Sequence, residues 1–222
     1  MKKFLLIFCL LFISYSFAQN DTISNKNQLE LKYYFGFGLV ALDDYNLSSR
    51  LEGDGFPDIK TEMFDVSFGI SLQSKRSMYT FEIGVTRSED DRNANEYELT
   101  RQNYSLDYQY NLFNIKQHKI NLGGRLSLNI TENELFNANS EADLENPSNL
   151  GELTKIDLTN WYLGPVVSFQ FTNKTNDPWL RLQLSYEFNI SENSWKSDYT
   201  QLLNSVKEDQ NQLRVQAIFP FF

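Results

Sequence analysis

The side chains that could do chemistry in this sequence are charged groups placed at alternate positions of strand-like segments. Parity assigns five acids and four bases to one set of faces: Glu30, Asp65, Glu82, Asp107 and Glu187 with Lys32, Arg125, Arg181 and Arg214. If these faces converge on a narrow interior, the charges must pair, because an unpaired buried ion is costly. Two hypotheses follow, a salt-bridged plug or an ion path, and we favour the plug because side chains can fill an eight-stranded interior.

One pair in this set has a specific expected geometry. If the hairpin between the fourth and fifth predicted strands is symmetric about Lys116, Asp107 faces Arg125 and Leu112 faces Ile120. Cross-strand pairs on one face of a sheet lie close enough to interact. We therefore predict an ion pair between Asp107 and Arg125.

Two glycine-containing sites predict irregularities in the strands. Gly123 and Gly124 are adjacent within a strand, where glycine often marks a β-bulge. Pro165 follows Gly164 in another strand and cannot donate a ladder hydrogen bond. We expect a bulge at Gly164 and Pro165, and a bulge at the first pair would disturb the Asp107–Arg125 register.

Catalytic residues are not predicted. Hydrolases and acyltransferases generally use a histidine base beside a serine or a carboxylate. The only histidine, His118, lies between Lys116 and Lys119 in a short predicted turn, far from the long loops. The only cysteine, Cys9, lies in a segment that we expect to be removed, which excludes thiolate chemistry from the mature chain. We predict no catalysis, no cofactor and no metal centre.

The elements that position the charges are strands, because apolar and polar residues alternate with a period of two. The pattern occurs in eight segments: 29–39, 64–72, 79–85, 104–112, 120–130, 163–171, 180–190 and 213–221. One face of each segment is apolar, and the other carries charged, amide, hydroxyl or glycine residues. A soluble lipocalin-like barrel would turn the apolar faces inward, whereas an outer-membrane barrel turns them to lipid.

The size of the apolar faces favours the membrane alternative. So many Phe, Tyr, Leu and Ile side chains would not fit inside eight strands, whereas a narrow polar lumen suits the small residues of the other face. The connections also alternate, with long loops at 41–60, 87–98, 131–155 and 192–209 and short turns at 74–77, 113–119 and 172–178. We predict an all-β fold, an eight-stranded antiparallel up-and-down transmembrane β-barrel over residues 29–222 with four long external loops.

The two sets of connections differ in charge. The four long loops sum to -13, whereas the short turns sum to +4. The acidic runs Glu89-Asp90-Asp91 and Asp54-Gly55-Phe56-Pro57-Asp58 offer hard oxygen ligands for divalent cations that bridge to lipopolysaccharide phosphates. The alternative, which we favour, is a solvated surface. Residues 198–206 show helical spacing behind Asp198, which predicts a short helix in the last loop.

Aromatic residues predict where the barrel meets the membrane interfaces. Trp and Tyr collect at both interfaces of membrane barrels, so two belts are expected. Four aromatics lie near the short turns, Tyr79, Phe171, Trp179 and Phe221, and three lie near the long loops, Phe64, Trp161 and Phe188.

The N-terminus predicts export. Lys2 and Lys3 precede an apolar run over 4–13, and Ser16-Phe17-Ala18 offers a cleavage site, so residues 1–18 are expected to be a cleaved signal peptide. Residues 19–28 then form a short periplasmic segment. The alternative of a lipoprotein acylated at Cys9 is disfavoured because the residue before it is not small. We expect location in a Gram-negative outer membrane, with both termini periplasmic and the long loops extracellular.

Composition excludes other classes. The chain has 222 residues, 41% hydrophobic and 15% aromatic, which is too apolar for a disordered chain. Its net charge of -9 argues against nucleic-acid binding, because such proteins need a basic surface.

The signal peptide, the eight alternating segments and the ending Ile218-Phe219-Pro220-Phe221-Phe222 resemble small OmpX/OmpA-type outer-membrane barrels and the PorT-like outer-membrane β-barrel family. The resemblance implies a scaffold, with membrane lipid, lipopolysaccharide, the barrel-assembly machinery during insertion and a protein at the external loops as partners. We favour a structural or surface-interaction role. The alternatives are an accessory component of a protein secretion system, which the PorT-like resemblance implies, and a narrow pore. Residues Asp21-Thr22-Ile23 are similar to an O-glycosylation acceptor.

Overall fold

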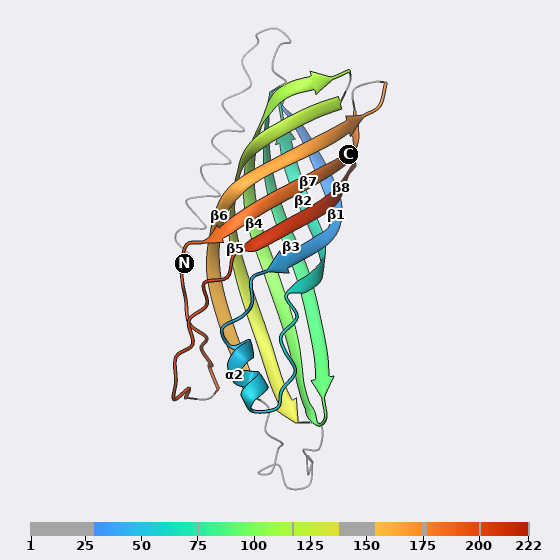
Figure 1. Cartoon of the computed structure of the whole chain (residues 1–222). Helices are drawn as coiled ribbons and strands as arrows, with labels where there is room; N and C mark the ends of the chain where they lie inside the picture. The colour runs from blue at the N-terminus through green and yellow to red at the C-terminus, as the bar shows by residue number, and fades with distance from the viewer. Residues whose placement is uncertain are drawn as a thin grey trace.

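Eight antiparallel strands form a closed barrel in this computed structural model, which describes residues 29–74, 76–116, 118–137, 154–174, 177–199 and 201–221. Each strand pairs with its sequence neighbours, and β1 pairs with β8 to complete the ring (Figure 1). The strands are β1 (Glu30–Leu42), β2 (Glu62–Gln73), β3 (Ser77–Arg92), β4 (Asn95–Ile115), β5 (His118–Asn137), β6 (Thr154–Thr172), β7 (Pro178–Asn189) and β8 (Gln212–Phe221). The predicted eight-stranded antiparallel up-and-down barrel is confirmed. The predicted signal peptide and the segment 19–28 lie outside the described residues.

The barrel is apolar outside and polar inside. Along β2, exposed Phe64, Val66 and Phe68 alternate with buried Asp65 and Ser67. Successive side chains of a strand point to opposite faces, so the same parity continues around the ring. The lipocalin-like alternative, in which the apolar side chains fill the interior, is therefore wrong.

Four consecutive strands are longer than the others. β3, β4, β5 and β6 have 16, 21, 20 and 19 residues, whereas β1, β2, β7 and β8 have 10–13. Figure 1 shows β3, β4 and β5 continuing past β8 toward the end that holds the short helix α2 (Ser48–Gly53). We call this the long-loop end, and its opposite the short-turn end.

The connection between β3 and β4 differs from the sequence-based expectation. A long loop was expected over 87–98, but β3 runs to Arg92 and β4 begins at Asn95. Asn93 begins the two-residue turn with a φ of 60°, a conformation that suits asparagine in tight hairpins. The alternation that identified the other strands is absent here because both faces of 87–92 are polar.

The β4–β5 hairpin contains a bulge that the sequence did not locate. Ile120 pairs with Phe113, so the expected pairing with Leu112 is wrong, and the register shifts between Asn111 and Phe113. The shift restores the expected register further along, because Asp107 does pair with Arg125.

The glycines of this hairpin do not form a bulge. Gly123 pairs with Gln109, and Gly124 pairs with Tyr108, without a register shift. A Cβ added to Gly123 would lie 1.8 Å from the carbonyl oxygen of Tyr108, so glycine is required by the close approach of β4.

The expected bulge at Gly164 and Pro165 is also absent. The β6–β7 register is the same on both sides of these residues, with Leu163 opposite Phe188 and Val166 opposite Ser185. Pro165 pairs with Gly124 of β5 on its other side. Proline is accommodated here as a local gap in the β6–β7 ladder.

The described loops at the long-loop end are residues 43–61, which contain α2, and residues 190–211 without 200. The helix predicted over 198–206 is wrong for the described part of that segment, which has no helical residue. Isolated bridges join Ser194 to Lys207 and Asp157 to Lys196, so this loop folds on itself and against β6. Across the described residues, no helix has the length and apolar character needed to cross a bilayer.

Candidate functional site

Arg125 of β5 is the centre of a charged network inside the barrel. Its side chain is fully buried, and Nη2 lies 2.5 Å from Glu82 Oε1. Its Nε lies 3.3 Å from Asp107 Oδ1 and 3.7 Å from Glu187 Oε1. The contact with Asp107 is an ion pair without hydrogen-bond geometry, whereas Nη2 donates to Glu82. The Arg125 guanidinium therefore shares its positive charge among three carboxylates.

Arg214 of β8 extends the network toward the long-loop end. Its Nη2 lies 2.5 Å from Asp65 Oδ2, and its Nη1 lies 3.0 Å from Glu82 Oε1. Glu82 thus lies between two guanidinium groups, and it also accepts a hydrogen bond of 3.0 Å from the hydroxyl of Tyr34.

Neutral polar side chains complete the network. The hydroxyls of Ser127 and Ser185 donate to Glu187, and Gln183 Nε2 donates to Asp107 Oδ2 over 3.1 Å. Buried carboxylates need such donors because each unsatisfied oxygen carries a desolvation penalty.

Arg181 is buried without an acidic partner. Among the described residues, no carboxylate lies within 4.0 Å of its guanidinium, which contacts Met78 Sδ at 2.7 Å and lies 5.2 Å from the centroid of the Tyr34 ring. A guanidinium over an aromatic face gains a cation–π attraction, which replaces part of its lost hydration.

Arg101 is a member of this interior that sequence reasoning missed. It is buried, donates a short hydrogen bond to Gln212 and lies 5.6 Å from the Tyr162 ring centroid. Arg101 has the same parity as Asp107, so the alternation would have placed it in the interior, but the predicted strand began at residue 104.

We define the lumen network as Asp65, Glu82, Asp107, Glu187, Arg101, Arg125, Arg181 and Arg214. Four carboxylates and four guanidiniums give a formal charge of zero, so the network needs no further counter-ion. A void of about 10 Å³ lies beside Asp65, Thr86 and Arg214, which is room for about one water. This part of the interior is filled by side chains.

Two residues expected in the lumen lie at its short-turn end instead. The Lys32 Nζ lies 3.4 Å from Glu30 Oε2 and 3.8 Å from Asp177 Oδ1. The Glu30 side chain is 60% exposed, so this pair is solvated. The structure therefore brings together seven of the nine residues expected in the lumen and separates these two.

The aromatic residues expected at the membrane interfaces all point outward. Tyr79, Phe171, Trp179 and Phe221 lie within three residues of strand ends at the short-turn end. Phe64, Trp161 and Phe188 lie toward the long-loop end of the same surface. Phe171 packs between the rings of His118 and Trp179, at 5.5 and 5.9 Å, and the other six are exposed. Their interfacial role stays a prediction.

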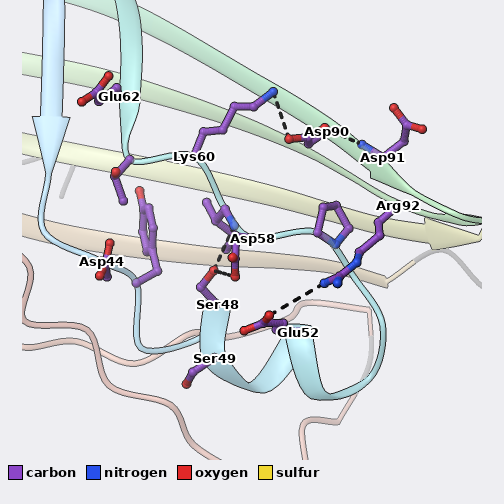
Figure 2. A pocket seen from close by; sticks show the side chains of 14 residues that line it. Asp44, Ser48, Ser49, Glu52, Asp58, Lys60, Glu62, Asp90, Asp91 and Arg92 are labelled. Carbon is purple, nitrogen blue, oxygen red and sulfur yellow. Dashed lines mark hydrogen bonds and ion pairs between the residues drawn. The ribbon is translucent and has the colours of Figure 1, made fainter.

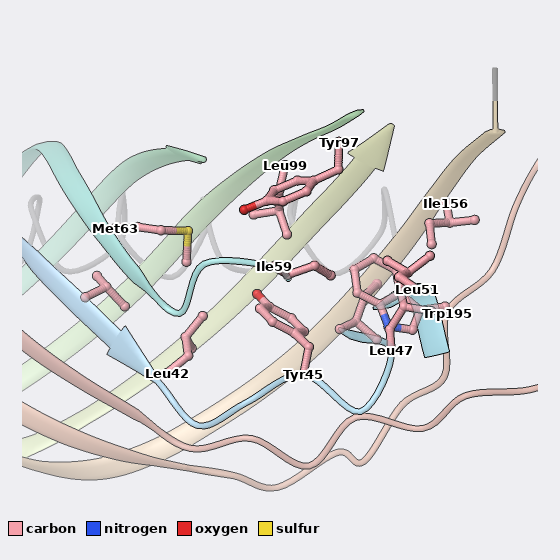
Figure 3. Close-up of a cluster of buried hydrophobic side chains, with 12 residues drawn as sticks. Leu42, Tyr45, Leu47, Leu51, Ile59, Met63, Tyr97, Leu99, Ile156 and Trp195 are labelled. Carbon is pink, nitrogen blue, oxygen red and sulfur yellow. The ribbon is translucent and has the colours of Figure 1, made fainter. Parts of the chain in front are cut away.

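An apolar core lies at the long-loop end, beyond the lumen network, and Figure 3 shows its side chains. We call it the outer cluster, and it consists of Val40, Leu42, Tyr45, Leu47, Leu51, Ile59, Met63, Tyr97, Leu99, Ile156, Leu158 and Trp195. Leu99 and Arg101 are successive inward-facing residues of β4, so the outer cluster begins directly beside the charged interior. The outer faces of the strands are charged here, with Arg87 3.0 Å from Glu98 and Lys155 2.7 Å from Glu132.

Glu208 joins the two described loops over this cluster. Its Oε1 accepts hydrogen bonds from Leu47 N at 2.9 Å and Trp195 Nε1 at 2.7 Å, and its Oε2 accepts one from Asn46 N at 2.8 Å. Burial raises the pKa of the Glu208 carboxyl above its usual value, although these donors act in the opposite direction. We call this arrangement the loop clamp.

A cleft of about 880 Å³ opens between the first loop and the outer part of β3 (Figure 2). We call it the acidic cleft because its lining contains six acids and two bases: Asp44, Glu52, Asp58, Glu62, Asp90 and Asp91 with Lys60 and Arg92. Lys60 Nζ lies 3.1 Å from Asp90 Oδ2, and this ammonium lowers the pKa of the Asp90 carboxyl. Arg92 Nη1 lies 3.8 Å from Glu52 Oε1.

The cation hypothesis for the acidic loops finds no ligand set. In the part of the chain that the structure describes, no group of three or more His, Cys, Asp or Glu residues is arranged to hold a metal ion. Glu89 pairs instead with Arg87 at 3.1 Å, and Asp58 accepts a hydrogen bond from Ser48.

His118 is a structural residue of the short-turn end. It begins β5, and its Nδ1 accepts a hydrogen bond from Thr172 N at 3.3 Å. Its ring packs 5.9 Å from that of Phe169. This environment orients the ring against the outer aromatic surface, away from the acidic cleft and the lumen network.

Structural comparison finds similar barrels. A major outer membrane protein from Thermus thermophilus aligns with a TM-score of 0.51 at 12% identity, over 86% of this chain and 99% of that one. The fold is that of an outer-membrane barrel protein. Ail, the attachment invasion locus protein of Yersinia pestis, aligns with a TM-score of 0.48 at 11% identity, over 87% and 99% of the two chains. The outer membrane protein AlkL, solved in DMPC lipid bilayers, gives 0.40 at 15% identity, over 90% and 94%.

The predicted resemblance to small outer-membrane barrels is thereby confirmed at the level of the fold. By sequence, the chain matches no family model and no curated protein.

Proposed function

We propose that this chain is an integral protein of a bacterial outer membrane and that it acts in surface interaction through its long-loop end. The observation that carries the proposal is the reversal of polarity along the barrel wall. Outward Val85 and Leu106 are exposed and apolar, whereas further along the same strands the outward positions become Arg87 and Glu98. An apolar band that gives way to charge marks the edge of a hydrocarbon layer.

The architecture of the long-loop end supports an interaction role. Outside the band, the strands and loops enclose a core of soluble type, and they shape the acidic cleft on its surface. A barrel that only filled the membrane would have no need for strands that continue so far beyond it.

The packing of the lumen argues against the narrow pore. Arg125 and Glu82 are fully buried and in direct contact, and the outer cluster lies across the same axis. Ion passage would require breaking a charge pair in a poorly solvated space, which is costly. Planar-bilayer conductance of the purified protein is expected to be absent, and catalysis forms no part of the proposed role.

Membrane fractionation with a matched pair of variants tests the location. Leu184 lies on the exposed face of β7 near the middle of the band, and arginine there is expected to destabilise the inserted barrel by about 2–4 kcal/mol. Glu96→Arg, on the outer part of β4, is the control and should insert normally. Wild type should sediment with outer membranes and shift its gel position on heating.

Recovery of the wild-type protein in the soluble periplasm would refute the proposal, and so would equal insertion of Leu184→Arg and the control. Proteins that co-purify with the native barrel from outer membranes would identify the partner, including components of a secretion system.

A further inference from the structure

The outer part of β3 is a sheet edge. β2 pairs with β3 as far as the Asp65–Thr86 pair, whereas β4 pairs with β3 as far as Arg92. Among the described residues, no strand pairs with the other side of 87–92. An edge strand presents unpaired backbone N–H and C=O groups that can accept a further strand.

One contact shows which backbone groups face this edge. The Glu89 carbonyl oxygen accepts a hydrogen bond of 2.9 Å from Lys60 Nζ, on the side away from β4. The N–H and C=O of one residue in an antiparallel strand point to the same side, so Arg87, Glu89 and Asp91 present their backbone groups to the edge. Within the described residues, the hydrogen bond of Asp91 N goes to the adjacent Asp90 carboxylate, at 3.0 Å, which is a contact within the edge itself.

The opposite edge of the projecting sheet is already occupied by this chain. Asp157 of β6 donates a backbone hydrogen bond of 2.7 Å to Lys196 O, and Lys196 N donates one of 2.9 Å to Asp157 O. A single bridge from the last loop therefore occupies this part of the β6 edge. The β3 edge has the acidic cleft in the corresponding place.

The charges of the cleft are not balanced by its own bases. Lys60 and Arg92 pair with Asp90 and Glu52, but the other four acids, Asp44, Asp58, Glu62 and Asp91, have no cation within 4.0 Å among the described residues. Lys60 also shows that an ammonium group fits this edge, because its Nζ contacts both the Glu89 carbonyl oxygen and the Asp90 carboxylate. Further cations that enter the cleft would therefore meet carboxylates that have no cationic partner there.

We propose that the acidic cleft binds an extended, lysine- or arginine-rich peptide segment of a partner protein, which adds as a strand to β3 at residues 87–92. The inference rests on the proposed surface role and names the partner class of that end. Six residues of edge span about 20 Å, which matches a short strand. Backbone hydrogen bonds to the edge provide affinity, and the carboxylates select basic side chains.

The test uses full-length protein in lipid nanodiscs and fluorescence anisotropy with blocked hexapeptides. The probe alternates lysine and valine, and its acidic counterpart replaces lysine by glutamate. Two further probes carry N-methyl groups on alternate amides, one set on each side of the strand. Only one of these two is expected to lose binding, because an added strand uses the amides of one side alone.

Matched variants separate charge in the cleft from charge near it. Asp44→Asn/Glu62→Gln/Asp91→Asn should weaken binding about tenfold, whereas Glu134→Gln/Glu192→Gln/Asp198→Asn, also three acids at the long-loop end, should change it by less than about twofold. Lys60→Ala should tighten binding about threefold, because it frees an edge carbonyl and removes a competing cation.

Equal loss with both N-methylated probes, no loss with either, or equal weakening by both triple variants would refute strand addition in this cleft. Absence of binding by a protein that fractionates with outer membranes would refute this inference alone. A protein that failed the fractionation experiment would instead refute the proposed function.

Discussion

The lumen network and the outer cluster occupy the same barrel and are both buried, yet they have opposite chemistry. In the lumen, Arg125 and Glu82 are fully buried and polar, and in the outer cluster Leu99 and Trp195 are nearly inaccessible and apolar. For a barrel that spans the membrane as proposed, the difference follows from the medium outside the wall. Where lipid takes the apolar face, the polar face must turn inward, and where water takes the outer face, the ordinary soluble pattern returns.

The two regions should also respond differently to mutation. Charge pairs in the lumen are directional and shared, so removing one partner leaves others uncompensated. Apolar burial is non-directional and roughly proportional to area, so losses in the outer cluster should be graded and local. This contrast can be tested from the strongest interaction down to the weakest.

The largest effect is expected from Arg125→Met. The change leaves Glu82, Asp107 and Glu187 short of a shared cation in the barrel interior. Breaking a buried ion pair by removing one partner costs about 3–5 kcal/mol, and here three carboxylates are affected. Urea unfolding in lipid vesicles should show a strongly lowered midpoint, or the barrel should fail to form.

Lys32→Met is the matched control for this change. Lys32 has two acidic partners, but both are largely exposed at the short-turn end. Exposed pairs contribute little to stability, so its unfolding midpoint should stay close to wild type. Similar losses in the two variants would contradict the assignment of Arg125 to a buried network.

The next effect is expected from Leu99→Ala in the outer cluster. Leu99 is inaccessible to solvent, and truncation of such a leucine costs about 2–4 kcal/mol through lost burial and the cavity that remains. Because the cluster lies beyond the band, the loss should fall on the loops and projecting strands. Hydrogen exchange should rise in 43–61 and 190–199, with the membrane-facing strands protected as in wild type.

A double-mutant cycle should give a smaller coupling within the lumen. Arg125 donates a hydrogen bond to Glu82, whereas its 3.3 Å contact with Asp107 lacks that geometry. Asp107→Asn with Arg125→Gln should therefore couple by about 1 kcal/mol, and Glu82→Gln with Arg125→Gln should couple by more. Additive losses in both cycles would show that these side chains do not act together.

The sequence predicted the fold because the signal is local and repeated. Alternation with period two identified all eight strands, parity placed Asp107 and Arg125 on the inward faces, and the assumed hairpin symmetry about Lys116 paired them. It also placed seven of the nine expected charges in the interior. These inferences need only the direction in which neighbouring side chains point.

The rest depended on information that the pattern does not carry. The outer part of β3 has two polar faces, so the sequence predicted a loop there. The β3 edge and Arg101, which lies on the paired strand β4, were missed for this reason. The outer cluster joins residues from several strands and two loops, and no short-range periodicity in the sequence predicts such packing. The bulge at Leu112 was also missed, because alternation does not show where one strand carries an extra residue. Ile120 therefore pairs with Phe113 and not with Leu112.

The smallest expected effect concerns the loop clamp and pH. Since burial raises the pKa of Glu208 in the folded protein, the folded state holds more protons than the unfolded state just above the ordinary glutamic acid pKa of about 4.3. The clamp should therefore strengthen as the pH falls into this range and weaken as the pH rises through the raised pKa. Denaturant titration of Trp195 fluorescence, in a Trp161→Phe/Trp179→Phe background, measures it.

Variants at the clamp assign this pH dependence to one carboxyl. Glu208→Gln should remove it, because the amide does not titrate, whereas Asp209→Asn should keep most of it, since Asp209 contributes only a weaker repulsion to the raised pKa. The alternative is a clamp held by the ionised carboxylate and its three donors, which would loosen on acidification. Trp195 emission that shifts toward that of exposed indole as the pH falls would establish this alternative and leave apolar burial as the main stabilisation of the outer cluster.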